Sequence, residues 1–252
     1  MIRVALVSYF NTKPFSDGLE QAFGPHEMEY HFLSPADCAK AMHAGGCDVA
    51  LLPVGSLLDF QGLDVLNHFC IGADGAVDSV FLFSDVPVQE VEELILDPHS
   101  RTSNGLARIL FSEHWKRPIT VRTSSQRPLD LVKKHTAAVM IGDLAHAERG
   151  RFKFVYDLSH EWKIMTGLPF VFAVWVCKQG GLDSIGLRQF ESALGSGWLQ
   201  RKKSAEKWGA TFGYTPKDAE SYLTQRIQYL FDDAKHKAMD HFFKALKALP
   251  DL

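Results

Sequence analysis

The sequence predicts an α/β fold with two lobes and a helical C-terminal segment. Short apolar runs rich in β-branched residues alternate with segments of helical spacing through the first two-thirds of the chain. A second series of this kind begins near residue 86, and from Asp183 onward the spacing is helical with no convincing strand. Because alternating strands and helices are typical of parallel sheets with covered faces, we expect parallel-type sheets in both lobes.

The predicted lobe boundaries follow from the order of these elements. A chain of 252 residues accommodates one large domain or two lobes of about 100–150 residues each. We expect crossovers near residues 84–87 and 174–178, so that residues 1–85 and 178–252 form one lobe and residues 86–177 the other. No flexible linker separates the lobes, so we expect short hinge strands with a cleft between the lobes.

In the first lobe, strands are predicted where apolar, β-branched runs occur, at residues 3–7, 28–33, 48–52, 63–69 and 79–83. Two helices have clear start signals. Pro14 fits the first turn of one helix, where a missing N–H costs nothing. Ser34 and Pro35 open the other as N-cap and first helical residue.

In the second lobe, the same reasoning places strands at residues 92–96, 119–122, 137–141, 152–156 and 170–177. Helices are predicted at residues 104–115, 128–134 and 158–165. In the C-terminal segment, Thr215 and Pro216 start a helix, and residues 234–249 have the apolar spacing of another.

Composition narrows the possible partners. The chain is 46% hydrophobic and 23% charged, as expected of a globular protein with a sizeable core. The net charge is −3 and no window forms a basic patch, which argues against nucleic-acid binding. No apolar run approaches the ~20 residues of a membrane span, so we expect no membrane insertion.

The expected location is the cytoplasm. The residues after Met1 enter a strand directly and lack the basic and apolar regions of an export signal. The four cysteines show no C-x-x-C spacing and lie in apolar surroundings. Buried free thiols are the simplest interpretation, and they fit a reducing compartment.

Neither a metal nor a cofactor is expected. The spacing of the eleven histidines matches no common metal motif; His236 and His241, for example, are off a single helical face. The phosphate-binding loop, the G-x-G-x-x-G fingerprint and the G-x-S-x-G nucleophile elbow are all absent from the sequence.

Polar side chains gather directly behind the first predicted strand. Ser8, Tyr9, Asn11 and Thr12 lie between that strand and Pro14. In open α/β sheets, ligands bind at the carboxyl ends of strands, so this segment is a candidate ligand site. The alternative is an ordinary strand-to-helix turn in which Asn11 is the helix N-cap.

Three other strand ends have a similar character: Pro53–Ser56, Ser100–Ser103 and Gly142–Asp143. Ser100, Thr102 and Ser103 precede a helix, whose free N–H groups and dipole favour an anion. One cap requires one hydroxyl and three are present, which favours a bound carboxylate over capping alone. Arg101 either pairs with that ligand or forms a structural ion pair with Asp97 or Asp143.

Six motifs occur in a specific order along the chain: Ser8–Pro14, Cys47–Val54, Ser79–Ser84, Ser100–Ser103, Ile141–Ala145 and Thr166–Trp175. Together they resemble the chorismate dehydratase family of the futalosine route to menaquinone, over nearly the whole chain. The resemblance implies a type II periplasmic-binding-protein-like fold without export. It also implies a lyase that converts chorismate to 3-[(1-carboxyvinyl)oxy]benzoate and water, with a small dianionic substrate as its partner.

Within this expectation, Asn11 and Ser79 are predicted to be catalytic. The predicted substrate-binding residues are Ser8, Tyr9, Thr12, Pro53, Ser100, Thr102, Ser103, Gly142 and Asp143. The base is either the enolpyruvyl carboxylate of the substrate itself or Asp143, unless Asp143 caps the following helix.

Two other functions remain open at this stage. The sister enzyme, 1,4-dihydroxy-6-naphthoate synthase, shares the fold but uses a histidine in its second lobe. The matching stretch around residues 139–145 has no histidine except the following His146, which favours the dehydratase. The other alternative is a non-catalytic cytoplasmic protein that binds a small carboxylate, because the same scaffold serves transport and sensing.

Overall fold

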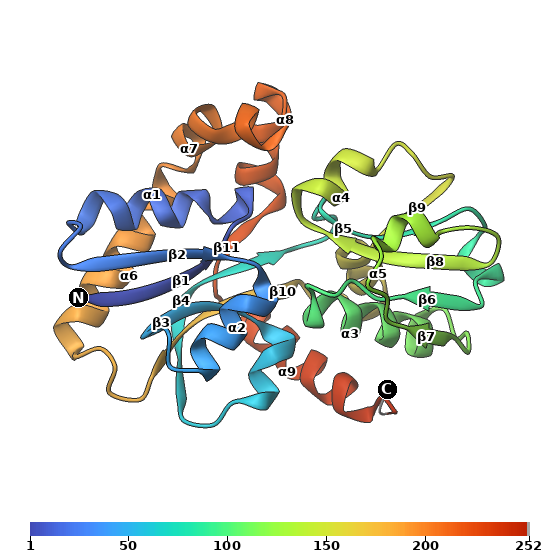
Figure 1. The fold of residues 1–252 in the computed structure, drawn as a ribbon, viewed down its shortest axis with the longest axis horizontal. Helices are drawn as coiled ribbons and strands as arrows, with labels where there is room; N and C mark the ends of the chain where they lie inside the picture. The colour runs from blue at the N-terminus through green and yellow to red at the C-terminus, as the bar shows by residue number, and fades with distance from the viewer. Residues whose placement is uncertain (251–252) are drawn as a thin grey trace. The chain divides into compact units, whose positions relative to one another are not determined.

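The computed structural model describes residues 1–250, apart from the side chains of residues 184 and 185. The chain forms two compact units, each with its own sheet. Unit 1 comprises Met1–Gly72 and Val171–Asp232, and unit 2 comprises Ala73–Phe170 and the described residues from Asp233 onward. Figure 1 traces both units in chain order. The predicted two-lobed α/β fold is therefore confirmed.

Unit 1 is built on a six-stranded sheet with the order β11-β4-β10-β3-β1-β2. Its strands are β1 Ile2–Val7, β2 Met28–Leu33, β3 Val49–Pro53, β4 Leu63–Ala73, β10 Phe170–Lys178 and β11 Gln228–Leu230. Its α-helices are α1 Lys13–Ala22, α2 Pro35–His43, α6 Ser184–Leu199, α7 Arg201–Trp208 and α8 Pro216–Ser221. Its shorter helical turns are η1 Phe10–Thr12, η2 Val54–Asp59, η6 Gly209–Phe212 and η7 Tyr222–Arg226.

Unit 2 is built on a five-stranded sheet with the order β7-β6-β8-β5-β9. Its strands are β5 Val80–Ser84, β6 Glu93–Ile95, β7 Thr120–Arg122, β8 Thr136–Ile141 and β9 Phe154–Asp157. Its α-helices are α3 Arg101–Ile109, α4 Gly142–Glu148, α5 Leu158–Thr166 and α9 Asp233–Ala248. Its shorter turns are η3 Val88–Glu90, η4 Leu110–His114 and η5 Pro128–Leu131.

The unit boundaries differ from the expected lobe boundaries at three places. Strand β10, expected in the second lobe, pairs with β3 in the sheet of unit 1. Strand β5, expected in the first lobe, pairs with β8 and β9 of unit 2, and so Ser79 also belongs to unit 2. Helix α9 belongs to unit 2 as well, because Phe242 packs edge-on against Phe170 with the ring centroids 5.3 Å apart. Strand pairing and packing decided these three assignments, and none of them can be deduced from chain order.

Both sheets are mixed, so the expectation of parallel-type sheets was only partly right. Strand β1 is parallel to β2 and β3, and β6 is parallel to β7 and β8. In contrast, β10 is antiparallel to β3, and β5 is antiparallel to both β8 and β9. The chain enters unit 2 with β5 and returns to unit 1 with β10. Each of these strands is antiparallel to the strands beside it that belong to the parallel series of that unit.

Two local predictions were wrong. The helix expected over residues 128–134 is only the 3₁₀ turn η5, which starts at Pro128 and ends at Leu131. Strand β11 lies in the C-terminal segment that was expected to be wholly helical. Three residues are too few to show the alternation that marks a strand, so pairing with β4 decides this one.

The four cysteines are buried, and no disulfide joins them in the described part of the chain, as their apolar surroundings suggested. Among the helices of residues 1–250, none combines the length and the apolar character that crossing a membrane requires.

Helices α1 and α6 of unit 1 pack at very close range through two glycines. A Cβ at Gly18 would lie 2.7 Å from the backbone nitrogen of Gly197. A Cβ at Gly197 would overlap the carbonyl group of Pro14, with 2.8 Å to its carbon atom. Because these neighbours are backbone atoms, no side-chain rotation can make room. The close contact fixes α1 and therefore the segment that leads into it.

We expect Gly197→Ala to lower the free energy of unfolding by about 2–3 kcal/mol, because the added methyl group forces the two helices apart. Gly186→Ala in the same helix is the matched control. Its Cβ would meet only side-chain atoms, the nearest being Oδ1 of Asp183 at 3.2 Å. Urea unfolding of both variants tests the prediction, and equal stabilities would contradict it.

Candidate active site

In unit 1, the chain leaves β1 through a tight turn that Thr12 closes. The Thr12 side chain is 1% exposed, and its hydroxyl lies 2.5 Å from the carbonyl oxygen of Val7 and 2.8 Å from that of Tyr9. Its single hydroxyl proton is therefore shared between main-chain acceptors. The Thr12 hydroxyl thus holds the turn that carries Asn11, and substrate binding by Thr12 stays a prediction.

Asn11 is held from both ends by tyrosine hydroxyls. Its side-chain amide donates to the hydroxyl of Tyr222 at 3.4 Å, and its main-chain carbonyl accepts from the hydroxyl of Tyr229 at 2.9 Å. Each tyrosine is only 2% exposed, and burial raises the pKa of Tyr229 well above its ordinary value. The Tyr229 hydroxyl is therefore a permanent donor to Asn11 at physiological pH.

Asn11 is not a helix cap. Helix α1 begins at Lys13 with Thr12 as its N-cap residue, and no side chain makes a capping hydrogen bond there. The alternative interpretation of the segment as an ordinary capped turn is thus wrong. The partly exposed Asn11 amide keeps hydrogen-bonding capacity beyond its contact with Tyr222.

Aromatic rings anchor the residue before Asn11. Phe10 is completely buried, and its ring centroid lies 4.8 Å from that of Tyr214, 5.5 Å from Phe212 and 5.8 Å from Tyr222. Such ring contacts fall in the favourable range for aromatic pairs. The Asn11 segment therefore rests on a platform formed by residues about two hundred positions later in the chain.

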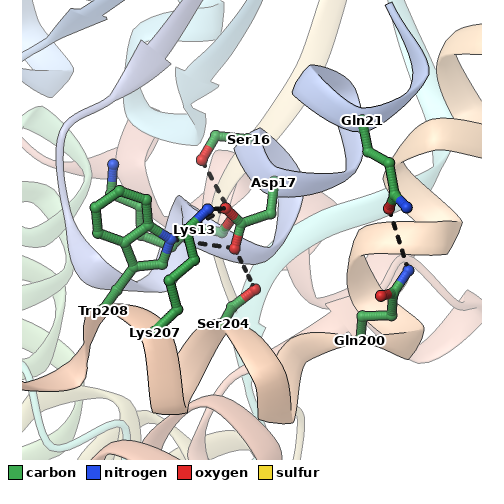
Figure 2. A network of polar contacts seen from close by, with 8 residues as sticks. All are labelled: Lys13, Ser16, Asp17, Gln21, Gln200, Ser204, Lys207 and Trp208. Carbon is green, nitrogen blue, oxygen red and sulfur yellow. Dashed lines mark hydrogen bonds and ion pairs between the residues drawn. The ribbon is translucent and has the colours of Figure 1, made fainter.

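A polar network ties the start of α1 to α7 (Figure 2). The carboxylate of Asp17 accepts from the Ser204 hydroxyl at 2.6 Å, from Nζ of Lys207 at 2.8 Å and from Nε1 of Trp208 at 3.0 Å. Nζ of Lys13 lies 4.5 Å from the ring centroid of Trp208, within the range of a cation–π contact. The network fixes the helix that directly follows Asn11.

The other predicted residues of unit 1 lie at the same edge of its sheet. The parallel pairing of β1 with β3 matches Val4 with Val49 and Ala5 with Ala50, so Ser8 and Pro53 come level at the strand ends. Ser8 is exposed, Tyr9 is partly exposed and Pro53 is buried. Unit 1 thus brings together all of its predicted site residues at the carboxyl end of neighbouring strands, where ligands bind in such sheets.

In unit 2, three strand ends meet at one sheet edge. Strands β6 and β8 are parallel and end there, whereas the antiparallel β5 begins there. The backbone N–H of Gly142 donates to the carbonyl oxygen of Ser79 at 2.8 Å, and that of Ile141 donates to Oδ2 of Asp97 at 3.3 Å. Gly142 has φ +76°, a left-handed conformation that glycine adopts without strain. Ser79 is 2% exposed.

The Ser100–Ser103 segment leads into α3 at the same edge. Ser100 is the N-cap, and its hydroxyl accepts from the backbone N–H of Ser103 at 3.2 Å. Capping therefore uses one hydroxyl. Thr102 and Ser103 add two buried hydroxyl groups to the first turn of the helix, where an anion is favoured.

Asp97 holds the loop before α3. Its carboxylate accepts from the backbone N–H of His99 at 2.8 Å as well as from Ile141, and burial raises its pKa above the ordinary value. Arg101 is exposed on the first turn of α3. Asp97 therefore serves the main chain of two strand ends.

Asp143 lies in the first turn of α4, but it does not cap that helix. The N-cap residue is Ile141, and no side chain makes a capping hydrogen bond at this end. Asp143 is partly exposed. The interpretation of Asp143 as a cap is thus wrong. Within residues 1–250, no group of three or more His, Cys, Asp or Glu side chains is arranged to hold a metal ion.

A family model described as menaquinone biosynthesis matches residues 2–248. The chain belongs to this family. The family resemblance inferred from the six motifs is therefore confirmed. Among curated proteins, this family member is similar to a chorismate dehydratase of Thermus thermophilus, with 27% identity over 231 residues that cover 84% of each protein.

Solved structures similar to this family member show the fold class. An Archaeoglobus fulgidus protein matches with a TM-score of 0.78 at 12% identity, covering 98% of this chain and 97% of that one. A Candida albicans protein with the generic periplasmic binding protein fold matches with a TM-score of 0.67 at 12% identity, covering 100% and 92%. The aliphatic sulphonate binding protein of Escherichia coli matches with a TM-score of 0.63 at 11% identity, covering 98% and 85%. The periplasmic-binding-protein-like fold is thereby confirmed.

Sequence reasoning missed three residues that contact the predicted site segments: Tyr222, Tyr229 and Asp157. No spacing rule connects the two tyrosines with Asn11, because 211 and 218 positions separate them from it. For Asp157, the sequence did contain a pattern that predicts its role. An aspartate between a strand and a helix is a typical N-cap, and Asp157 caps α5.

Proposed function

We propose that this menaquinone biosynthesis family member is a chorismate dehydratase, a lyase of the futalosine route that forms 3-[(1-carboxyvinyl)oxy]benzoate and water. Its similarity to the Thermus thermophilus chorismate dehydratase supports the proposal. The observation that carries it is Asn11: an amide at a strand end, held by two tyrosine hydroxyls and used for no helix cap.

The reaction removes one proton and one hydroxide from the ring of chorismate. The proton leaves carbon 3, and the electron pair of that C–H bond enters the ring system, stabilised by the conjugated ring carboxylate. The C–O bond at carbon 4 then breaks, the hydroxide takes up a proton to form water, and the ring becomes aromatic. Because aromatisation drives the second step, the enzyme mainly has to orient the dianion and stabilise developing charge.

We assign carboxylate binding to the first turn of α3. The buried hydroxyls of Thr102 and Ser103 lie at a helix N-terminus whose cap, Ser100, is already supplied. Hydroxyl donors and the positive end of the helix dipole favour a carboxylate at such a position. The proposed set of substrate-binding residues is completed by Ser8, Tyr9, Thr12, Pro53, Ser100, Gly142 and Asp143.

We assign proton removal to the enolpyruvyl carboxylate of the substrate, which is attached through oxygen at carbon 3 itself. The role of Asn11 is to hold this carboxylate, or the leaving hydroxyl, in the reactive geometry. Ser79 is the second proposed catalytic residue, as a donor beside Gly142. Asp143 is the other candidate base, since it is a partly exposed carboxylate that caps no helix.

Incubation of the purified protein with chorismate tests the function directly. We expect conversion to the enolpyruvyl benzoate without added cofactor, detected by mass spectrometry of the product. Chorismate binding without any turnover would instead indicate a binding protein and would contradict the proposal.

Asn11→Asp is expected to reduce turnover roughly a hundredfold or more, because it removes a donor and adds a negative charge beside a dianionic substrate. Steady-state kinetics measures the loss. Asn67→Asp, the same change at an exposed position of β4, is the matched control and should leave turnover unchanged. Ser79→Ala should cause a smaller loss than Asn11→Asp. Near-wild-type turnover of Asn11→Asp would remove Asn11 from the mechanism.

Thr102→Val is expected to weaken chorismate binding by about 1–3 kcal/mol, because it keeps the shape of the side chain but removes one donor. Thermal stability should change little, since Ser100 supplies the helix cap. Thr120→Val at an exposed position of β7 is the control. If the melting temperature of Thr102→Val falls while the affinity of the folded protein stays constant, Thr102 is structural only.

A further inference from the structure

Ser79 is reached through a turn with an unfavourable backbone conformation. Asp78, the residue directly before it, has φ +60°. A residue with a side chain seldom adopts this left-handed region, and the surrounding contacts must hold it there. The position of Ser79 therefore depends on whatever holds residues 77 and 78.

The side chain of Asp157 holds that turn. Its Oδ2 accepts from the backbone N–H of Val77 at 2.9 Å and from that of Asp78 at 2.7 Å. The pairing of β5 with β9 sets Asp157 opposite Phe81, two residues beyond Ser79. A single carboxylate oxygen thus holds both N–H groups that precede Ser79.

The other oxygen of the same carboxylate fixes Asp157 itself. Oδ1 accepts from the backbone N–H of Ser159 at 3.0 Å and from that of His160 at 3.1 Å, at the N-terminus of α5. The carboxylate accepts four N–H bonds in all, two from the turn before Ser79 and two from the helix. Hydrogen bonds to an ionised acceptor are stronger than those between neutral groups.

The ionised form of Asp157 is costly for folding. Burial raises the pKa of Asp157 to about 6, and the nearby carboxylate of Asp78 also raises it, although the N–H bonds from Val77, Asp78 and His160 act in the opposite direction. Because the folded-state pKa lies above the ordinary value, the stability gained from protonation is complete below about pH 4 and is lost as the pH rises through about 6. At neutral pH the charge therefore lowers folding stability, while it supplies the turn with a strong acceptor.

We propose that Asp157 is a positioning residue for Ser79. Its carboxylate holds the turn of Val77 and Asp78 against the N-terminus of α5 and so fixes the place of Ser79. The inference rests on the proposed catalytic role of Ser79. It adds a residue that does not itself contact the reacting atoms.

Asp157→Ser separates the two functions of the carboxylate. Serine is a good N-cap, so its hydroxyl can still cap α5. Its side chain is shorter than that of aspartate and has one oxygen, so it cannot at the same time accept from the turn of Val77 and Asp78. Asp157→Asn is the second variant: if its amide oxygen caps α5, its NH₂ group faces the N–H donors of Val77 and Asp78. Asp183→Ser is the matched control, because Asp183 caps α6 by accepting from the N–H of Gly186 at 2.7 Å.

Two measurements test the proposal: amide hydrogen exchange of residues 73–80, and steady-state turnover of chorismate. We expect both Asp157 variants to exchange faster at residues 77–79. Their kcat should fall by about 10- to 100-fold, with little change in KM, as for a misplaced catalytic group. Asp183→Ser should match the wild type in both measurements.

The outcomes separate this inference from the proposed function. If the wild-type protein turns over chorismate and both Asp157 variants do so with the same kcat, the positioning role is overturned, even if hydrogen exchange becomes faster. Unchanged exchange at residues 77–79 would overturn the claim that Asp157 holds the turn. Absence of wild-type turnover would refute the dehydratase proposal, and the exchange measurement would then still decide whether Asp157 orders the turn.

Discussion

The backbone polar groups at the strand ends need partners, and the candidate site depends on how that need is met. Where a strand stops, its next N–H and C=O groups leave the sheet, and burying them unpaired is costly. In this protein, side chains are their partners. Thr12 bonds to the last carbonyl of β1, Asp97 to the last N–H of β8, and Asp157 to the N–H groups that precede β5. Each of these side chains holds a loop that carries a proposed substrate-binding or catalytic residue. The rigidity of the site thus follows from satisfying the main chain.

Two of these partners are carboxylates, and their burial has a cost. Desolvation raises the pKa of both Asp97 and Asp157. A neutral acceptor would be easier to bury, but a carboxylate has two oxygens with several lone pairs and can accept from separate segments. Asp97 joins the ends of β6 and β8 in this way, and Asp157 joins the turn before β5 to α5. Sacrificing some folding stability for order at a strand edge is expected where groups must be held for chemistry.

The C-terminal part of unit 1 supports Asn11 from a distance in sequence. Helix α7 holds Asp17 of α1 through Ser204, Lys207 and Trp208. The residues that follow supply the rings around Phe10 and the hydroxyls of Tyr222 and Tyr229. The C-terminal segment, which shows only helical spacing in the sequence, therefore orients the polar segment Ser8–Thr12 after β1.

The sequence alone determined the α/β class, the positions of most strands, the polar strand ends and the family. These properties depend on local patterns: apolar runs, cap residues, proline positions and ordered motifs. Tertiary structure decided that β5 and α9 belong to unit 2, that both sheets are mixed, and that β11 exists. It also decided that Thr12 serves the main chain, and that Tyr222, Tyr229 and Asp157 hold the residues around Asn11 and Ser79. Hydrogen bonds between residues up to 218 positions apart depend on the path of the whole chain, and no local pattern records that path.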